Sequence, residues 1–137
     1  DETAPAIFLV GGVGVTPVRS ILYDTLENKK QHPLYLFFSN RRPEDAVFLA
    51  ELSALAKSNP TFHFIPTMTG MEDSAKQWDG EIGYIDNVMI QKYVPDVNRA
   101  IYYSAGPLPM VIAMRSFLVA HGVDDNNILT EEFTGYY

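Results

Sequence analysis

Cysteine is absent from this chain of 137 residues, and positive charge is scarce. Without cysteine the chain has no disulfide, no thiolate metal site and no cysteine nucleophile, and we expect a cytoplasmic location. There are 10 Lys and Arg residues against 17 Asp and Glu residues, which gives a net charge of −7. Nucleic acid is therefore not an expected partner, because phosphate backbones need a basic surface.

Sequence signals of several other protein classes are also missing. No apolar run approaches the ~20 residues of a membrane span, and there is no signal-peptide pattern. No serine has a Gly-x-Ser-x-Gly setting, and no pair among the 3 histidines has metal-ligand spacing. With 47% hydrophobic residues, the chain has the composition of one globular domain over residues 1–137. Because it begins with Asp1 shortly before an apolar run, we expect a domain cut from a longer chain.

Short apolar runs alternate with helical patterns along the chain. The apolar runs at 6–10 and 34–38 predict buried strands. The alternating segment 62–67, the segment 100–104 and a fifth that begins at 128 predict three more strands. Apolar residues at helical spacing predict helices over 16–28, from near 43 to the Asn59-Pro60 break, over 85–93, and from the break at 105–109 to 121. Five strands alternating with four helices predict an α/β fold with a mostly parallel sheet and ligands at its carboxyl edge. The polar segment 69–80 is the one we expect to be mobile.

The glycine-rich stretch after the first apolar run organises the rest of the chain. Gly11, Gly12 and Gly14 separate a predicted strand from a predicted helix, with Thr16 as its N-cap and Pro17 in its first turn. Glycines let a backbone approach a ligand closely, and a helix start offers free N–H groups to an anion such as phosphate. Neither standard phosphate loop fits, because Pro17 stands where the dinucleotide fingerprint needs its third glycine and no Lys follows Gly14. A purely structural turn explains the stretch equally well.

Two further turns fall at the same predicted edge of the sheet. Ser39-Asn40-Arg41-Arg42 follows the second strand, and its arginines suit adenine stacking or a 2′-phosphate, with solvated surface arginines as the alternative. No acid precedes Glu44 there, although the classical NAD site has one that bonds the ribose 2′-hydroxyl. Gly106-Pro107 follows the fourth strand and either admits a flat ligand or only starts a helix. Together with the glycine-rich stretch after the first strand, Gly106-Pro107 makes two glycine or proline turns on one edge of the sheet, which favours a shared ligand.

Five segments together carry a family resemblance. They are residues 11–17 (Gly-Gly-Val-Gly-Val-Thr-Pro), 40–45 (Asn-Arg-Arg-Pro-Glu-Asp) with the nearby Phe48 and Glu51, 78–85 (with Trp78), 105–110 (Ala-Gly-Pro-Leu-Pro-Met) and 131–133 (Glu-Glu-Phe). In this order they resemble the pyridine-nucleotide-binding domain of the ferredoxin–NADP reductase superfamily, over almost the whole chain. The resemblance implies a three-layer fold with a five-stranded parallel sheet in the order 3-2-1-4-5 and helices on both faces.

The resemblance also implies a function and a set of site residues. NAD(P)H would lie across the strand ends and pass a hydride to FAD held by a separate N-terminal barrel, whose Arg-x-Tyr-Ser-type motif is absent here. The implied partners are that barrel in the same chain and an electron-acceptor protein, and the isolated domain is expected to be inactive. Thr16 and Glu132 are the catalytic candidates. The implied cofactor-binding residues are Gly11, Gly12, Gly14, Val15, Thr16, Pro17, Ser39, Asn40, Arg41, Arg42, Thr69, Ala105, Gly106, Pro107, Met110 and Phe133.

Departures from the family pattern refine these expectations. Ala105 stands where the family often has the cysteine that borders the nicotinamide. Thr69-Gly70 lacks the arginine with which many NADP-specific members hold the 2′-phosphate, which favours NADH, while Arg41 and Arg42 leave NADPH open. Tyr136 and Tyr137 are candidates for the terminal aromatic that covers the flavin ring in plant-type members.

Two alternatives come from other functional classes. The first is a nucleotide-sensing or partner-binding regulatory module with the same fold and no electron transfer. The second is a receiver-like signalling domain, which is disfavoured because it needs an acidic cluster where this chain has glycines at the end of its first strand.

Overall fold

The computed structural model describes residues 4–28 and 32–132. Its strands are β1 (Ala6–Gly11), β2 (Leu34–Asn40), β3 (Phe62–Met68), β4 (Glu81–Ile82), β5 (Ile101–Gly106) and β6 (Ile128–Glu132). Its α-helices are α1 (Val15–Asn28), α2 (Leu49–Ser58), α3 (Asn87–Tyr93) and α4 (Leu108–Ala120). None of the helices in these two segments is long and apolar enough to cross a membrane.

The strands form one parallel sheet in the order β4-β3-β2-β1-β5-β6. The prediction of five strands was therefore wrong, because the sheet of the described residues has a sixth strand. This strand, β4, is two residues long and lies at the outer edge, where Glu81 and Ile82 pair with Thr67 and Met68 of β3. The five expected strands follow the order 3-2-1-4-5 among themselves.

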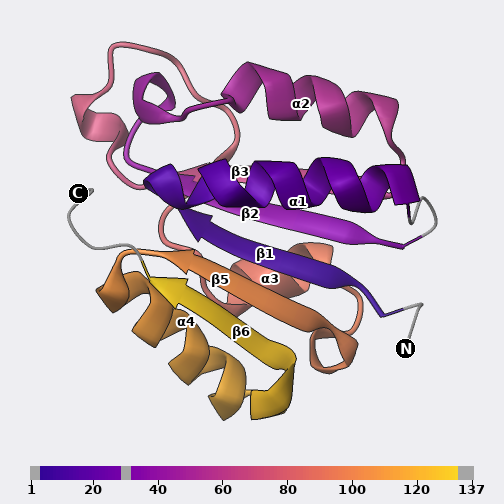
Figure 1. Cartoon of the computed structure of the whole chain (residues 1–137). Helices are drawn as coiled ribbons and strands as arrows, with labels where there is room; N and C mark the ends of the chain where they lie inside the picture. The colour runs from indigo at the N-terminus through magenta and orange to yellow at the C-terminus, as the bar shows by residue number, and fades with distance from the viewer. Residues whose placement is uncertain (1–3, 29–31, 133–137) are drawn as a thin grey trace.

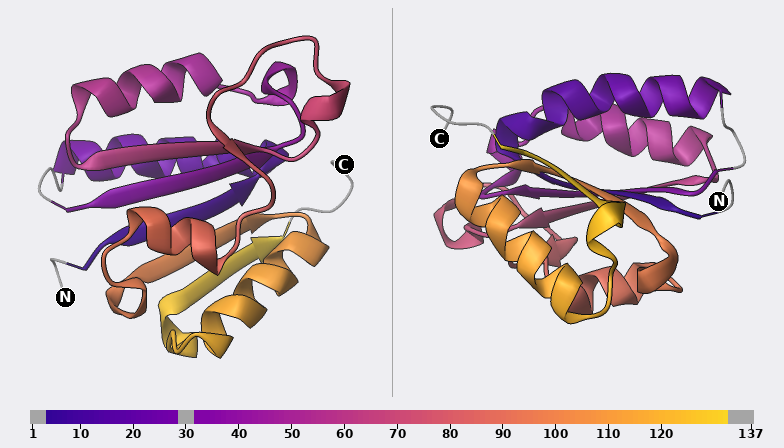
Figure 2. Two further views of the ribbon diagram at one scale, coloured as in Figure 1. Left: turned by 180° about the vertical axis from the view of Figure 1, so that it is seen from behind. Right: turned by 60° about the horizontal axis from the view of Figure 1, so that its bottom comes forward.

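Helices cover both faces of the sheet, as the sequence predicts. Helices α1 and α2 lie on one face, and α3 and α4 lie on the other (Figures 1 and 2). Because side chains alternate along a strand, Ile7 and Leu9 of β1 join the core under α3 and α4. Phe8 and Val10 join the core under α1 and α2. The sheet is thus buried on both faces, which explains why its central strands are continuous apolar runs.

Two helix starts differ from the sequence expectation. Helix α1 begins at Val15 and continues a 3-10 turn, Gly12–Gly14, so Thr16 lies inside the helix and is not its N-cap. Helix α2 begins at Leu49 and not near Pro43. The segment that precedes α2 forms a 3-10 turn, Pro43–Asp45, and Phe48 adopts a left-handed conformation with φ of 66° that interrupts any continuous helix.

Candidate functional site

A cavity of about 680 Å³ opens at the carboxyl edge of the sheet. The ends of β1, β2, β3 and β5 all contribute to it, and this edge contains the point where strand order switches sides between β1 and β5. The arrowheads of the strands in Figure 1 point to the left, so the carboxyl edge of the sheet lies on the left of that view. The lining residues are Gly11, Gly12, Val13, Ser39, Asn40, Arg41, Arg42, Asp45, Val47, Thr69, Asp73 and Pro107.

The turn after β1 leaves open space above its backbone. Gly12 has a positive φ of 55°, and a Cβ built on it would meet no atom within 4 Å. The 3-10 turn Gly12–Gly14 runs directly into α1, and the first N–H groups of a helix have no acceptor within that helix. These N–H groups and the positive end of the helix dipole make this side of the cavity suited to an anion.

The turns after β1 and β5 are packed against each other. A Cβ on Gly14 would lie 2.8 Å from the carbonyl oxygen of Ala105, and one on Gly11 would lie 2.3 Å from Sδ of Met110. Gly14 therefore allows the two backbone turns to approach more closely than any larger residue permits, and Gly11 makes room for the side chain of Met110 from α4. This contact fixes the glycine turn relative to Pro107, which lines the other side of the cavity.

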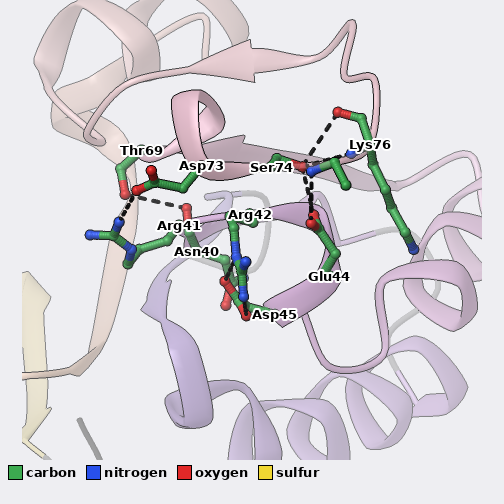
Figure 3. A network of polar contacts seen from close by, with 10 residues as sticks. Asn40, Arg41, Arg42, Glu44, Asp45, Thr69, Asp73, Ser74 and Lys76 are labelled. Atoms are coloured by element: carbon green, nitrogen blue, oxygen red, sulfur yellow. Dashed lines mark hydrogen bonds and ion pairs between the residues drawn. The ribbon is translucent and has the colours of Figure 1, made fainter.

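The two arginines at the end of β2 are each paired with an aspartate, as Figure 3 shows. Arg42 donates from Nε and Nη2 to the two oxygens of Asp45, both at 2.9 Å. Arg41 donates from Nη2 to Asp73 at 2.8 Å. The hydrogen bond from Arg42 is the main cause that holds the pKa of the Asp45 carboxyl below its ordinary value. Both aspartates therefore accept hydrogen bonds from arginines at the rim of the cavity.

The loop after β3 is tied to the end of β2 by further hydrogen bonds. The Gly70 N–H donates to the carbonyl oxygen of Arg41 at 2.8 Å. Glu44 accepts from the Ser74 hydroxyl at 2.7 Å and from the Ala75 N–H at 3.2 Å (Figure 3). The Ser74 contact is the main cause of the lowered pKa of the Glu44 carboxyl. Together these bonds make the loop one wall of the cavity.

Asn40 supplies a polar group that lacks a partner within the described residues. Its side chain lines the cavity and is only 8% exposed, yet Nδ2 makes no hydrogen bond there. A buried amide donor without an acceptor costs free energy, so such groups usually have a ligand or water as partner. Asn40 thus has a buried donor without a partner in the described residues, next to the cavity at the edge where the sequence predicts a nucleotide.

The structure places the predicted cofactor-binding residues in three groups. Eight of them line the cavity: Gly11, Gly12, Ser39, Asn40, Arg41, Arg42, Thr69 and Pro107. Seven do not, namely Gly14, Val15, Thr16, Pro17, Ala105, Gly106 and Met110. Of these, Val15 and Ala105 are fully buried, and Thr16 is exposed. Phe133, Tyr136 and Tyr137 lie outside the described residues. The backbone of Glu132 pairs with Gly106 at the end of β6.

Four residues that line the cavity are not predicted from the sequence: Val13, Asp45, Val47 and Asp73. In the sequence, Asp45 reads only as a favourable charge in the first turn of a helix. The signal that could have found it is its spacing from Arg42, since residues three apart on a helical turn face each other. Within the described ranges, no group of three or more His, Asp or Glu side chains is placed to hold a metal ion.

Comparison with known families agrees with this geometry. The model of the oxidoreductase NAD-binding domain family matches residues 8–116, most of the chain. The chain belongs to this family. The match includes every residue that lines the cavity, from Gly11 to Pro107. It confirms the resemblance that the sequence motifs indicate and supports the oxidoreductase interpretation over a regulatory module.

Individual relatives extend the comparison. The NAD-binding domain is 30% identical to one component of the Na(+)-translocating NADH-quinone reductase of Shewanella denitrificans, over 98% of this chain and 34% of that protein. It is 25% identical to the CDP-6-deoxy-L-threo-D-glycero-4-hexulose-3-dehydrase reductase of Yersinia pestis, over 97% of this chain and 39% of that one. The crystal structure of flavohemoglobin from Malassezia yamatoensis with bound FAD and heme superposes with a TM-score of 0.81 and 26% identity, over 97% of this chain and 32% of that one. The chain thus spans about a third of the length of the relatives it matches.

Proposed function

We propose that this chain is the NADH-binding module of a flavin-dependent oxidoreductase. It positions the nicotinamide so that a hydride can pass to FAD on a separate domain, and a further protein accepts the electrons. The observation that carries the proposal is the cavity at the carboxyl edge of the sheet, in which the open glycine turn and the paired arginines lie on adjacent strands. The identities of the relatives support it, since one is a component of an NADH-quinone reductase and another was solved with FAD.

The lining residues fit an extended dinucleotide. The free N–H groups of the turn Gly12–Gly14 would hold the diphosphate, where a Cβ on Gly12 would meet open space. The arginines and Asn40, one strand further along the sheet, would hold the adenosine half. The backbone of Gly106 and Pro107 would border the nicotinamide, together with the exposed Thr16 near the start of α1. When bound, NADH supplies the hydride from C4 of its nicotinamide ring.

The contribution of this chain is therefore positioning. The packed contact between Gly14 and Ala105 holds the two turns at a fixed separation, so a dinucleotide that spans them keeps one orientation. A domain that holds FAD in the same protein and a cytoplasmic location are parts of the same proposal. The greater length of the relatives supports the first, and the lack of cysteine supports the second.

Two measurements on the purified 137-residue chain test the proposal. Isothermal titration calorimetry should show saturable binding of NADH. The absorbance of NADH mixed with the chain and a soluble electron acceptor should remain constant, because hydride transfer needs the flavin. Failure to bind NADH, or oxidation of NADH by this chain alone at enzyme-like rates, would refute the proposal.

A further inference from the structure

The charges next to the two arginines of the cavity bear on whether it binds NADH or NADPH. NADPH differs from NADH by one 2′-phosphate on the adenosine ribose, and free arginines at the end of the second strand would attract that phosphate. In this structure Arg41 and Arg42 are already bonded to Asp73 and Asp45 (Figure 3). The lining residues therefore contain two positive and two negative side chains, which leaves no net positive charge for a phosphate.

The backbone holds both aspartates beside the arginines. Asp45 closes the turn Pro43–Asp45, and its N–H donates to the carbonyl oxygen of Arg42 at 3.0 Å. Asp73 closes the turn Met71–Asp73, and its N–H donates to the carbonyl oxygen of Gly70 at 3.1 Å. Gly70 is itself bonded to the backbone of Arg41. The ion pairs are partly exposed, and each is individually weak. The carboxylates nevertheless stay near the arginines when a pair opens, because their backbones are fixed.

A carboxylate discriminates between the two nucleotides in a simple way. An ionised carboxylate has spare lone pairs and accepts hydrogen bonds from ribose hydroxyls. The same carboxylate repels a phosphate dianion that occupies the hydroxyl position. Glu44, in the same turn as Asp45 and bonded to Ser74 of the neighbouring loop, adds a third negative charge close to this rim.

We propose that Asp45 and Asp73 are specificity-determining residues that make the cavity select NADH over NADPH. This inference rests on the proposed function, since it assumes that a pyridine dinucleotide occupies the cavity. In the sequence, Arg41 and Arg42 leave NADPH open as the cofactor. In the structure, both arginines form ion pairs with aspartates from two different turns, which favours NADH.

The test compares binding of NADH and NADPH to the 137-residue chain by isothermal titration calorimetry. The wild type should prefer NADH. Asp45→Asn and Asp73→Asn should each strengthen NADPH binding about tenfold, the order expected for removal of one partly screened charge near a phosphate. The double variant should bind NADPH more tightly than either single variant, and the gain should shrink as salt is added.

Asp79→Asn is the matched control, since Asp79 is exposed on the same loop and does not line the cavity. This variant makes the same chemical change and should leave the ratio of the two affinities unaltered. A wild type that binds NADPH as tightly as NADH, or aspartate variants whose ratio stays at the wild-type value, overturns the inference while the proposed function stands. A chain that binds neither nucleotide overturns both.

Discussion

The three glycines of the turn after β1 act in different ways. Only Gly12 has a positive φ, and only its Cβ position points into open space. Gly11 and Gly14 instead make room for Met110 and for the backbone of Ala105. A single glycine-rich stretch thus combines one position that a ligand can approach with two that allow close packing of adjacent turns.

Substitution of Gly12 tests ligand approach without disturbing the packing at Gly11 and Gly14. In Gly12→Ala the new methyl group occupies the part of the cavity assigned to the diphosphate, and we expect the affinity for NADH to fall about tenfold, equivalent to about 1.4 kcal/mol. Gly83→Ala is the control, because Gly83 also has a positive φ and open space at its Cβ position but lies outside the cavity. Both variants should lose some stability from backbone strain, and thermal unfolding measures that cost separately. Equal NADH affinities for the two variants would argue against a diphosphate at Gly12.

The sequence predicts backbone features of the site better than its side-chain pairs. Gly12, Arg42 and Pro107 all line the cavity as expected, because each follows a recognisable strand. The bond between Arg41 and Asp73 joins positions 32 residues apart, and no local pattern specifies it. It depends on β2 and β3 being neighbours, which brings the loop after β3 over the end of β2.

Among the secondary-structure elements, β4 is the strand that the sequence pattern does not predict. Two residues are too few for an alternating pattern, so this strand is defined by its contacts. Trp78 donates from Nε1 to the carbonyl oxygen of Glu81 at 2.8 Å. The Glu81 carboxylate accepts from Lys92 at 2.7 Å and from the hydroxyl of Tyr93, and thereby joins β4 to α3. Burial, followed by the bond to Glu81, raises the pKa of Tyr93 to about 12.

This junction gives the stability a pH dependence. The hydrogen bond from Lys92 is the main cause that lowers the pKa of the Glu81 carboxyl below its ordinary value of 4.5. A lowered pKa stabilises the folded state above that value, and this contribution is lost as the pH falls through the folded-state pKa. We expect Glu81→Gln to reduce the free energy of unfolding by about 1–2 kcal/mol at neutral pH. The difference from wild type should shrink in acid.

Urea unfolding of wild type and Glu81→Gln across the acid range measures this difference. Glu72→Gln, at an exposed position on the loop before β4, is the matched control and should follow the wild type. A constant difference between wild type and Glu81→Gln at every pH would contradict the assignment.

At the scale of the whole molecule, strand order creates the site. The chain leaves β1, builds β2, β3 and β4 on one side, and then crosses to build β5 and β6 on the other. The helices that follow β1 and β5 therefore lie on opposite faces of the sheet, while the turns that lead into them meet at the carboxyl edge, and the end of β2 completes the cavity. The alternation of strands and helices predicts this architecture. The sequence does not predict the start of α2, because the 3-10 turn at Pro43 and the left-handed Phe48 interrupt an apparently continuous helical pattern.

The proposed function requires that NADH binds across this edge with its diphosphate at the glycine turn. Amide chemical-shift mapping by NMR during titration of the 137-residue chain with NADH tests it most directly. We predict saturable shifts for the amides of Gly12, Val13 and Gly14, together with those of Asn40 and Arg41. The absence of shifts at the glycine turn, or shifts confined to the opposite edge of the sheet, would contradict the account.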